Sequence, residues 1–393
     1  MKLKDLGDLI VFDTFPLMFE PKQKIIITHL LHLEQQTFPS QLPMIFTTFK
    51  LAQQLRNFCD IKKHKCINKS NLIVVKPYEF IDIVLERRLT LQILFCASEE
   101  YESNNVMVLI RENGKLNYIY GGNFIDIRSA LLNDTFASWI SNGVEKLYVN
   151  LKRMDENHTF NDIDQMQKVF KSIEAIMIYH RGSRLHIHLP LFGFEHFILK
   201  LAEYFPKRLK FSNLKMFYLN LNDDDEQQIA AYFLNDNDDE NEKIILHNEE
   251  STPYQANMKF KNTKEVTINI FSDQINCKNF EIYNNNGYYE LFYSPEPSPF
   301  HLKLLCMLVK PKRIFGIVDT FNNKSIVPKY LYELCVGAKE RIMKKQERKL
   351  SDPFQLAGSS RQPIMTVIPA GVTNNSRKTG PYLSDSESDN NEV

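Results

Sequence analysis

Two histidines and a glutamate follow an apolar run near the start of the chain. The run Lys24–Thr28 is typical of a strand, and His29, His32 and Glu34 lie in the segment after it. His29 and His32 are three residues apart, so the first turn of a helix would bring both imidazoles to one face. Two imidazoles and a carboxylate suit one zinc ion. Isolated His and Glu residues on loops more often face solvent or make hydrogen bonds, and both interpretations stay open.

A second group of histidines lies in the middle of the chain. His186 and His188 alternate with apolar residues in the predicted strand Leu185–Leu189, so they share one face of it. His180 and His196 are nearby in sequence. Three imidazoles could bind a metal ion, but a polar strand face is the simpler interpretation of this pattern.

Basic residues are candidates for contact with nucleic-acid phosphates, since Lys and Arg neutralise phosphate charge. These candidates are Lys152, Arg153, Arg181, Arg184, Lys310, Lys312 and Arg313. Each is equally compatible with a solvated surface charge. The chain has 48 Lys+Arg and 48 Asp+Glu, and this formal net charge of zero excludes a general electrostatic attraction to nucleic acid. Any such contact must be local.

The elements that must position these residues fall into two kinds. Short β-branched and aromatic runs fill residues 9–151 and predict a sheet-rich unit, with a type I′ hairpin at Asn113-Gly114. After Asn150, apolar residues recur at three- and four-residue spacing over Ile163–Met177, which predicts a helix. The strand Leu185–Leu189 and a second helical stripe, 194–205, follow. This part of the chain therefore predicts an α/β unit.

The remainder of the chain contains a helix, a strand and two polar segments. Leu302, Leu305, Cys306 and Val309 make one helix face, and Pro311 ends that helix before a strand at 314–318. Residues 220–250 are acidic and Asn-rich, which predicts an exposed loop. Order is expected to end near residue 348, because Ser, Pro, Gly and acidic residues dominate the last segment and predict a disordered tail.

Bulk properties indicate a globular protein. Its 393 residues are 43% hydrophobic, enough for a sizeable core. The six cysteines are scattered, mostly in apolar runs, which favours reduced, buried thiols inside a cell. The first twenty residues have no signal-peptide pattern, and no apolar stretch has the length of a membrane span. We expect a soluble, intracellular protein with no membrane partner.

The order of several landmarks resembles the β-CASP metallo-β-lactamase family of DNA-repair nucleases, the group of Artemis and Apollo. In that family a strand leads to a His-x-His-x-Asp-His loop, and here a strand leads to His29–Glu34. Later landmarks match the segments Tyr120–Phe124 and Lys146–Asn150. Near the end, Tyr293–Phe300 and Val309–Val318 correspond to the family's closing His loop and final strand. The resemblance covers roughly residues 9–318.

This resemblance implies a fold and a division of the chain. The fold class would be α/β, an αββα metallo-β-lactamase sandwich with an inserted β-CASP α/β domain. Residues 1–150 would form the first part of the core and 151–292 the insert, with the acidic loop at 220–250. Residues 293–348 would return to the core, and 349–393 would be the disordered acidic tail.

The resemblance also implies a degenerate metal site. Only His29 stands in register with a family ligand, and the other ligand positions hold Leu31, Leu33, Glu34, Asn123, Asn150 and Pro297. Hydrolysis of a phosphodiester with this scaffold requires bound zinc-type ions. We therefore expect no cofactor and no confident catalytic residue. In a rival arrangement His32 and Glu34 join His29 around one zinc, with a carboxylate from Glu99, Glu100 or Glu102.

Three functions follow as hypotheses. The first is a catalytically inactive, DNA- or protein-binding scaffold in DNA repair or chromosome-end maintenance, nuclear by resemblance, with repair or telomere proteins as possible partners. The second is an active metal-dependent 5′-exonuclease or endonuclease with the rebuilt one-metal site. The third is an interaction module that has lost DNA binding as well.

Overall fold

A computed structural model shows a mixed α/β protein with several sheets. The structure describes residues 8–64, 67, 70–87, 89–97, 105–154, 162–190, 192–211, 244–247, 265–272, 287–318 and 326–336. The chain divides into two compact units, Met1–Met343 and Lys344–Val393, and all described residues lie in the first. Within these residues no helix combines the length and apolar character needed to cross a membrane.

The largest sheet has six strands in the order β15-β9-β8-β7-β6-β5. Its strands are β5 (Phe80–Glu86), β6 (Leu89–Cys96), β7 (Met107–Glu112), β8 (Leu116–Gly122), β9 (Lys146–Val149) and β15 (Arg313–Gly316). Strands β5 to β8 are antiparallel neighbours, whereas β9 is parallel to β8 and β15 is parallel to β9. Residues from two distant parts of the chain therefore share this sheet.

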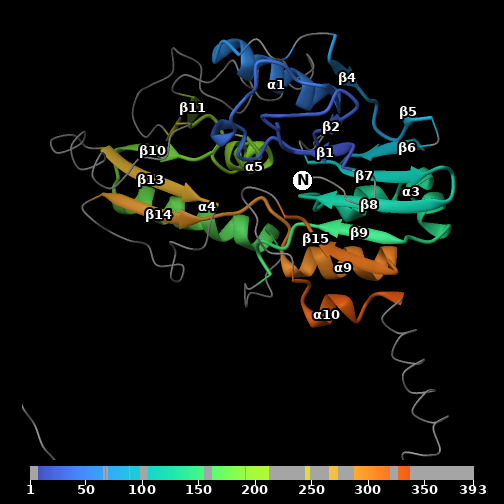
Figure 1. Ribbon diagram of the computed structural model, residues 1–393. Helices are drawn as coiled ribbons and strands as arrows, with labels where there is room; N and C mark the ends of the chain where they lie inside the picture. Colours follow the sequence, from blue (N-terminus) through green and yellow to red (C-terminus); the bar gives the residue numbers. More distant parts are fainter. Residues whose placement is uncertain are drawn as a thin grey trace, which may run out of the picture. The chain divides into compact units, whose positions relative to one another are not determined.

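The central strands of the six-stranded sheet are buried on both faces, because their alternate side chains enter two different clusters. On β6, Ile93 and Phe95 pack in one cluster while Leu94 and Cys96 pack in the other. The second cluster also contains residues of α2 (Ile127–Leu131), α3 (Asp134–Ser141) and α9 (Pro299–Val309). In Figure 1, α9 runs beneath β9. Helices thus cover one face of this sheet.

A four-stranded parallel sheet packs into the other cluster. It has the order β1-β2-β3-β4, formed by β1 (Ile10–Phe12), β2 (Lys24–Ile26), β3 (Met44–Thr47) and β4 (Leu72–Val74). Helix α1 (Phe49–Ile61) buries Leu51, Leu55 and Phe58 in the same cluster. Figure 1 shows α1 above this sheet and α9 below the six-stranded one. The layer order is helix, sheet, sheet, helix.

A third sheet is formed only by residues between 184 and 292. Its order is β11-β12-β10-β13-β14, and all its neighbours are parallel. The strands are β10 (Arg184–His188), β11 (Leu209–Phe211), β12 (Ile244–His247), β13 (Glu265–Phe271) and β14 (Tyr288–Phe292), accompanied by α4 (Asp162–Tyr179) and α5 (Glu195–Tyr204). The division of the first unit into a core and an insert stays a prediction.

Several predicted elements are confirmed. The hairpin joins β7 to β8 with Asn113 at φ 47° and Gly114 at φ 70°, as a type I′ turn requires. The predicted helices correspond to α4, α5 and α9, and α9 begins with the hydroxyl of Ser298 accepting from the backbone N–H of His301. Cys59, Cys96, Cys306 and Cys335 are buried as thiols rather than disulfides, and burial raises the pKa of Cys306 to about 12. Cys66 and Cys277 lie outside the described residues.

Two sequence-based expectations are wrong. The acidic segment 220–250 was expected to be a loop throughout, but Ile244–His247 form β12, which pairs with β10 and β11. The side chains of Ile244 and Leu246 are buried. The rest of that segment lies outside the described residues. Helix α1 was not predicted, although its buried residues recur with helical spacing, because the strand-like runs on either side dominated the pattern.

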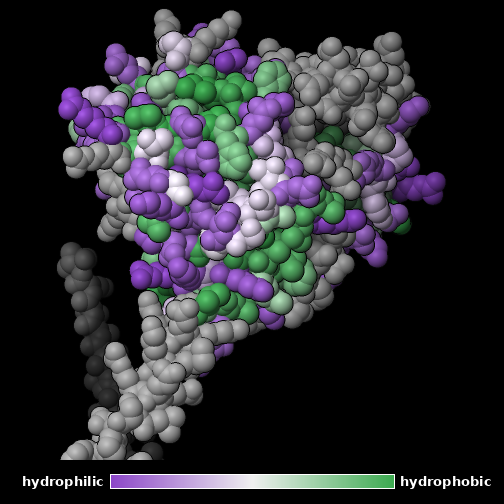
Figure 2. Space-filling view, turned by 90° about the vertical axis from the view of Figure 1, so that its right-hand side faces the viewer, coloured by the Kyte–Doolittle hydropathy of each residue, from purple (hydrophilic) through white to green (hydrophobic). Residues whose placement is uncertain are grey.

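One apolar surface stands out on the helical side of the six-stranded sheet. The outer face of α9 exposes Phe300, Leu304 and Met307, and α10 (Lys329–Tyr332) exposes Tyr330 and Tyr332. Figure 2 shows hydrophobic side chains gathered low on this side of the molecule, at the height of α9 and α10 in Figure 1. Phe300, Leu304 and Met307 are four and three residues apart, so they form one stripe.

Candidate functional site

A buried aspartate joins the ends of β1, β2 and β8. Asp13 follows β1 and is only 6% exposed. One carboxylate oxygen, Oδ1, accepts from the backbone N–H of Thr28 at 2.6 Å, and Oδ2 accepts from the Thr28 hydroxyl at 2.8 Å and from Tyr120 Oη at 2.9 Å. These donors satisfy a charge that would otherwise be costly to bury. Sequence reasoning missed Asp13, although an acid directly after an apolar strand is a recognisable signal.

His29 lies beside this carboxylate. Its Nε2 is 3.5 Å from Asp13 Oδ2, and its Nδ1 accepts from the backbone N–H of Leu31 at 3.2 Å. Because Nδ1 acts as an acceptor, a neutral His29 carries its proton on Nε2, facing Asp13. His29 and Asp13 therefore form a polar pair near the protein surface, since the His29 side chain is 12% exposed.

The expected grouping of His29 and His32 on one helix face is wrong. His32 precedes a single 3₁₀ turn, η2 (Leu33–Gln35), and has the left-handed backbone conformation φ 62°, ψ 16°. No helix therefore brings the two imidazoles to one face. The side chain of Glu34 and residues Glu99, Glu100 and Glu102 lie outside the described part of the chain. Among the described residues, no three His, Cys, Asp or Glu side chains are grouped to hold a metal ion.

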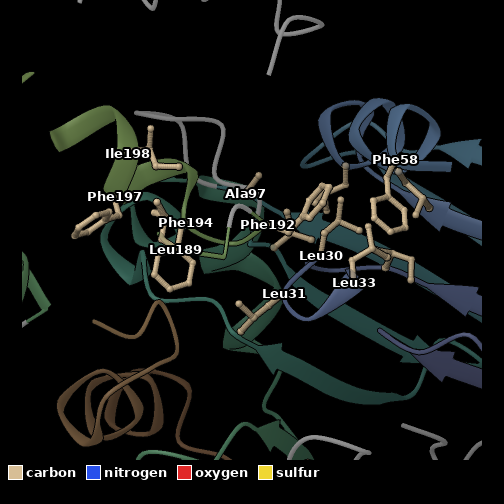
Figure 3. Packing of buried hydrophobic residues seen from close by; sticks show 14 of the residues in the cluster. Leu30, Leu31, Leu33, Phe58, Ala97, Leu189, Phe192, Phe194, Phe197 and Ile198 are labelled. Atoms are coloured by element: carbon tan, nitrogen blue, oxygen red, sulfur yellow. The ribbon is translucent and has the colours of Figure 1, made fainter. Parts of the chain in front are cut away.

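Leucines fill the positions where the resemblance implies metal ligands. Leu31 and Leu33 are 3% and 1% exposed, and both belong to the larger apolar cluster. Figure 3 shows them with Leu189, Phe192 and Phe194 from the segment between β10 and α5. That segment approaches so closely that a Cβ on Gly193 would lie 2.9 Å from Leu31 Cδ1. Apolar side chains therefore fill the space where the resemblance implies metal ligands.

Asn123 and Asn150 meet at the ends of β8 and β9. Asn150 Nδ2 donates to Asn123 Oδ1 at 2.7 Å and to Glu296 Oε1 at 3.2 Å. The side-chain oxygen of Asn150, Oδ1, accepts from the backbone N–H of Lys152 at 2.9 Å. The resemblance places both asparagines at metal-ligand positions. The structure brings them together, and they hydrogen-bond to each other.

Glu296 completes this network from the loop before α9. It is 3% exposed, accepts from the Ser294 hydroxyl at 3.3 Å and lies 3.5 Å from the Nζ of Lys152. Pro297, the position implied for the closing His, is buried beside it. Sequence reasoning considered Pro297 and missed the acid one residue earlier. Lys152 balances the Glu296 charge, so its predicted role in DNA contact competes with an internal ion pair.

Arg153 has a structural role in place of the expected DNA contact. The residue is 6% exposed, and its guanidinium donates to the backbone carbonyls of Ser294 at 3.2 Å and Glu296 at 2.6 Å. It also donates to Gln165 Oε1 on α4 at 3.2 Å. Arg153 therefore joins the end of β9, the loop before α9 and α4.

Lys310, Lys312 and Arg313 lie at and before the start of β15, whereas the Asn150 network lies beside the other end of that strand. Arg313 is paired in register with Lys146, the first residue of β9, whereas Asn150 follows its last. Lys310 and Lys312 precede Arg313, so the three cations lie roughly 13 Å or more from Asn150 at about 3.3 Å per residue. Lys312 forms an ion pair with Glu145. Their expected contact with DNA stays a prediction.

The central histidines form a stack with a partner that sequence reasoning missed. His186 Nδ1 is 2.8 Å from Nε2 of His247 on β12, and the rings of His188 and His247 stack with centroids 4.5 Å apart. Burial lowers the pKa of His186, Arg184 adds to this shift and Glu265 opposes it. The strand face is polar, as the simpler interpretation predicted. His196 is exposed on α5.

Arg181 and Arg184 lie in and after the turn that joins α4 to β10. Both are exposed, so a contact with phosphate is sterically open to them. His180, in the same turn, forms a 2.6 Å hydrogen bond with Tyr289 Oη, and burial lowers its pKa. These residues belong to the five-stranded unit and contribute nothing to the network around Asn150.

Comparisons with known proteins leave the chain without a family. It matches no protein-family profile and no curated protein. Among solved structures it is similar to a protein of unknown function from Enterococcus faecalis V583, at 11% identity and a TM-score of 0.47, covering 78% of this chain and 80% of that one. It is also similar to the isothiocyanate hydrolase from Delia radicum gut bacteria, at 13% identity and a TM-score of 0.23, covering 38% of this chain and 59% of that one. At these TM-scores neither likeness assigns a function.

Proposed function

We propose that this chain is a catalytically degenerate relative of the β-CASP metallo-β-lactamase nucleases that acts as a DNA- or protein-binding scaffold. Its setting would be DNA repair or chromosome-end maintenance in the nucleus, with repair or telomere proteins as partners. The proposal includes an αββα core and a β-CASP insert. The layer order and the return of β15 to β9 support it.

One observation carries the loss of catalysis. Asn150 donates to Asn123 and Glu296, and its own oxygen accepts from the chain, so both polar atoms of this side chain already have protein partners. A metal ion requires ligand atoms that point into a shared space. The neighbouring ligand position, Leu31, packs against Gly193 and offers no ligand atom. This arrangement favours a structural network over a metal centre.

The alternative is an active 5′-exonuclease or endonuclease with one zinc ion. The pair of Asp13 and His29, 3.5 Å apart, favours it, because a carboxylate and an imidazole are both zinc ligands. In this alternative His32 and Glu34 would supply the remaining ligands. Bound zinc would lower the pKa of a water molecule, and the chain's own residues would orient the phosphodiester.

Metal content separates these functions. The full chain is dialysed against trace zinc and its metal measured by elemental analysis, beside a His29→Ala, His32→Ala double variant and a His196→Ala control. We expect no stoichiometric zinc in any of the three proteins. Near-stoichiometric zinc that is lost only in the double variant would overturn the scaffold proposal and direct assays to 5′-ended DNA.

Salt dependence separates DNA binding from a purely protein-binding role. Phosphate contacts release counterions, so DNA affinity should fall steeply between 50 and 200 mM salt, roughly in proportion to the number of contacts. We expect Arg181→Ala and Arg184→Ala together to reduce the slope by about 2, because both residues are exposed. An affinity for DNA that is undetectable at low salt would leave protein binding alone.

A further inference from the structure

The five-stranded unit contains a cavity of about 550 Å³. It lies where the C-terminal ends of α4 and α5 approach the start of β10, and Val266 of β13 contributes to its wall. Its volume is in the range of small-molecule sites. None of the residues of the Asn150 network lines it, so the proposal that follows does not depend on the proposed function.

One part of the wall can bind an anion. Arg181 and Arg208 line the cavity from the turns after α4 and α5, and the Ser183 hydroxyl lies between α4 and β10. An arginine guanidinium presents several N–H donors in a planar fork that matches phosphate or carboxylate oxygens. Glu174 is the acid of the wall, and it accepts a hydrogen bond from Tyr204 Oη at 2.9 Å. That contact directs the Glu174 carboxylate to the tyrosine.

The other lining residues are mostly aromatic and apolar. The Tyr204 side chain is 40% exposed, and Phe205 and Leu185 line the cavity beside it. The hydrogen bond to Glu174 raises the pKa of Tyr204, so its ring stays neutral. His180 adds a second flat ring. Burial lowers the pKa of His180, and its Nε2 forms a hydrogen bond with Tyr289 Oη. Such rings can stack with a planar heterocycle.

We propose that this cavity binds a nucleoside phosphate, with its phosphate on Arg181 and Arg208 and its base against Tyr204 and His180. The combination matters, because an arginine pair alone would suit any anion and a tyrosine alone any apolar ring. Free nucleotides and the terminal nucleotide of a strand share this chemistry. Both sources can reach it, since Arg181, Arg208 and Tyr204 are exposed.

Binding of adenosine monophosphate to the full chain, measured by isothermal titration calorimetry, tests the proposal. We expect Arg181→Ala to weaken binding about 10- to 100-fold, as for the loss of charge-assisted hydrogen bonds. Lys171→Ala is the matched control, because Lys171 is an exposed cation on α4 that does not line the cavity. Tyr204→Phe should retain affinity and Tyr204→Leu should lose it, and melting curves show whether each variant is folded.

Further ligands distinguish the sources and define failure. Tighter binding of a 5′-phosphorylated oligonucleotide than of the monophosphate would assign the cavity to a strand end, and the reverse would assign it to a free nucleotide. Either result supports the proposal if Arg181→Ala weakens that binding by the expected factor. Inorganic phosphate or adenosine binding as tightly as the monophosphate would overturn it. So would equal losses in Arg181→Ala and Lys171→Ala, or no binding at millimolar ligand.

Discussion

The strand-end network and the α4–α5 cavity differ in where their polar groups are directed. Around Asn150, Glu296 and Asp13, donors and acceptors face one another inside the protein and are nearly inaccessible. Around Arg181 and Tyr204, the polar and aromatic groups border a cavity open to ligands. The comparison teaches that a site's position in a fold is a weaker guide to function than the direction of its functional groups. Stability should therefore depend mainly on the network, and binding on the cavity.

The largest effect on stability is expected at Arg153. Replacing it with alanine removes three hydrogen bonds and leaves the buried carbonyls of Ser294 and Glu296 without their donor. We expect the free energy of unfolding to fall by about 3 kcal/mol or more. Urea denaturation measures this, with Arg313→Ala on the exposed start of β15 as control. A loss below 1 kcal/mol would contradict a structural role for the network.

Gly193→Ala should give the next largest loss, about 2 to 3 kcal/mol. Its φ of +87° disfavours a side chain, and the new Cβ would lie 2.9 Å from Leu31 Cδ1. Gly143→Ala is the matched control, since its φ is +81° but nothing lies within 4 Å of its Cβ position. The control should lose about 1 kcal/mol. Equal losses in the two variants would mean that the packing against Leu31 contributes nothing.

Asp13→Asn tests the carboxylate that joins β1, β2 and β8. An amide keeps the shape but has only one acceptor oxygen, so it loses either the bond from the Thr28 backbone N–H or the bonds from the Thr28 hydroxyl and Tyr120. We expect a loss of about 2 kcal/mol in unfolding free energy. Tyr120→Phe provides the comparison, because it removes one donor and keeps the acid. An Asp13→Asn variant as stable as the parent would show that this charge is dispensable.

The smallest effect is expected from pH in the five-stranded unit. Burial lowers the pKa of His186, so the unfolded chain binds a proton at this residue more readily than the folded one. The contribution of His186 is therefore complete above the ordinary histidine pKa of about 6.5 and declines as the pH falls below it. The difference in unfolding free energy between the parent and His186→Gln, measured from pH 8 to 5, should shrink accordingly. A constant difference would exclude this linkage.

The sequence predicted the elements better than their contacts. Strong local signals, such as Asn113-Gly114 and the apolar stripe of α4, appear unchanged in the structure. Asn123 and Asn150 were both placed at implied metal-ligand positions, and their side chains form a hydrogen bond with each other. The partner Glu296 was missed because it comes from 146 residues away. The stack of His186 with His247 was missed for the same reason, since a pairing between β10 and β12 has no local signature.

Arg153 illustrates why the remainder could not be predicted. Its neighbours in sequence suggest a surface cation, and only the approach of Ser294 and the loop before α9 makes it a buried residue. Whether a charged side chain faces solvent or carbonyl groups is decided by tertiary contacts. The same reasoning applies to Lys310, Lys312 and Arg313, whose positions at and before the start of β15 depend on the register of that strand with β9.

The pairing of β15 with β9 sets an order of events during synthesis. Lys312 and Glu145 are 167 residues apart, and Arg153 reaches across 141 residues to Ser294. A growing chain that has just completed β9 must therefore keep one edge of its largest sheet unpaired until more than 160 further residues have left the ribosome. Such late closure is slow, because distant segments must meet before their contacts stabilise them. Through this interval the exposed edge of β9 can pair wrongly with strands of other chains.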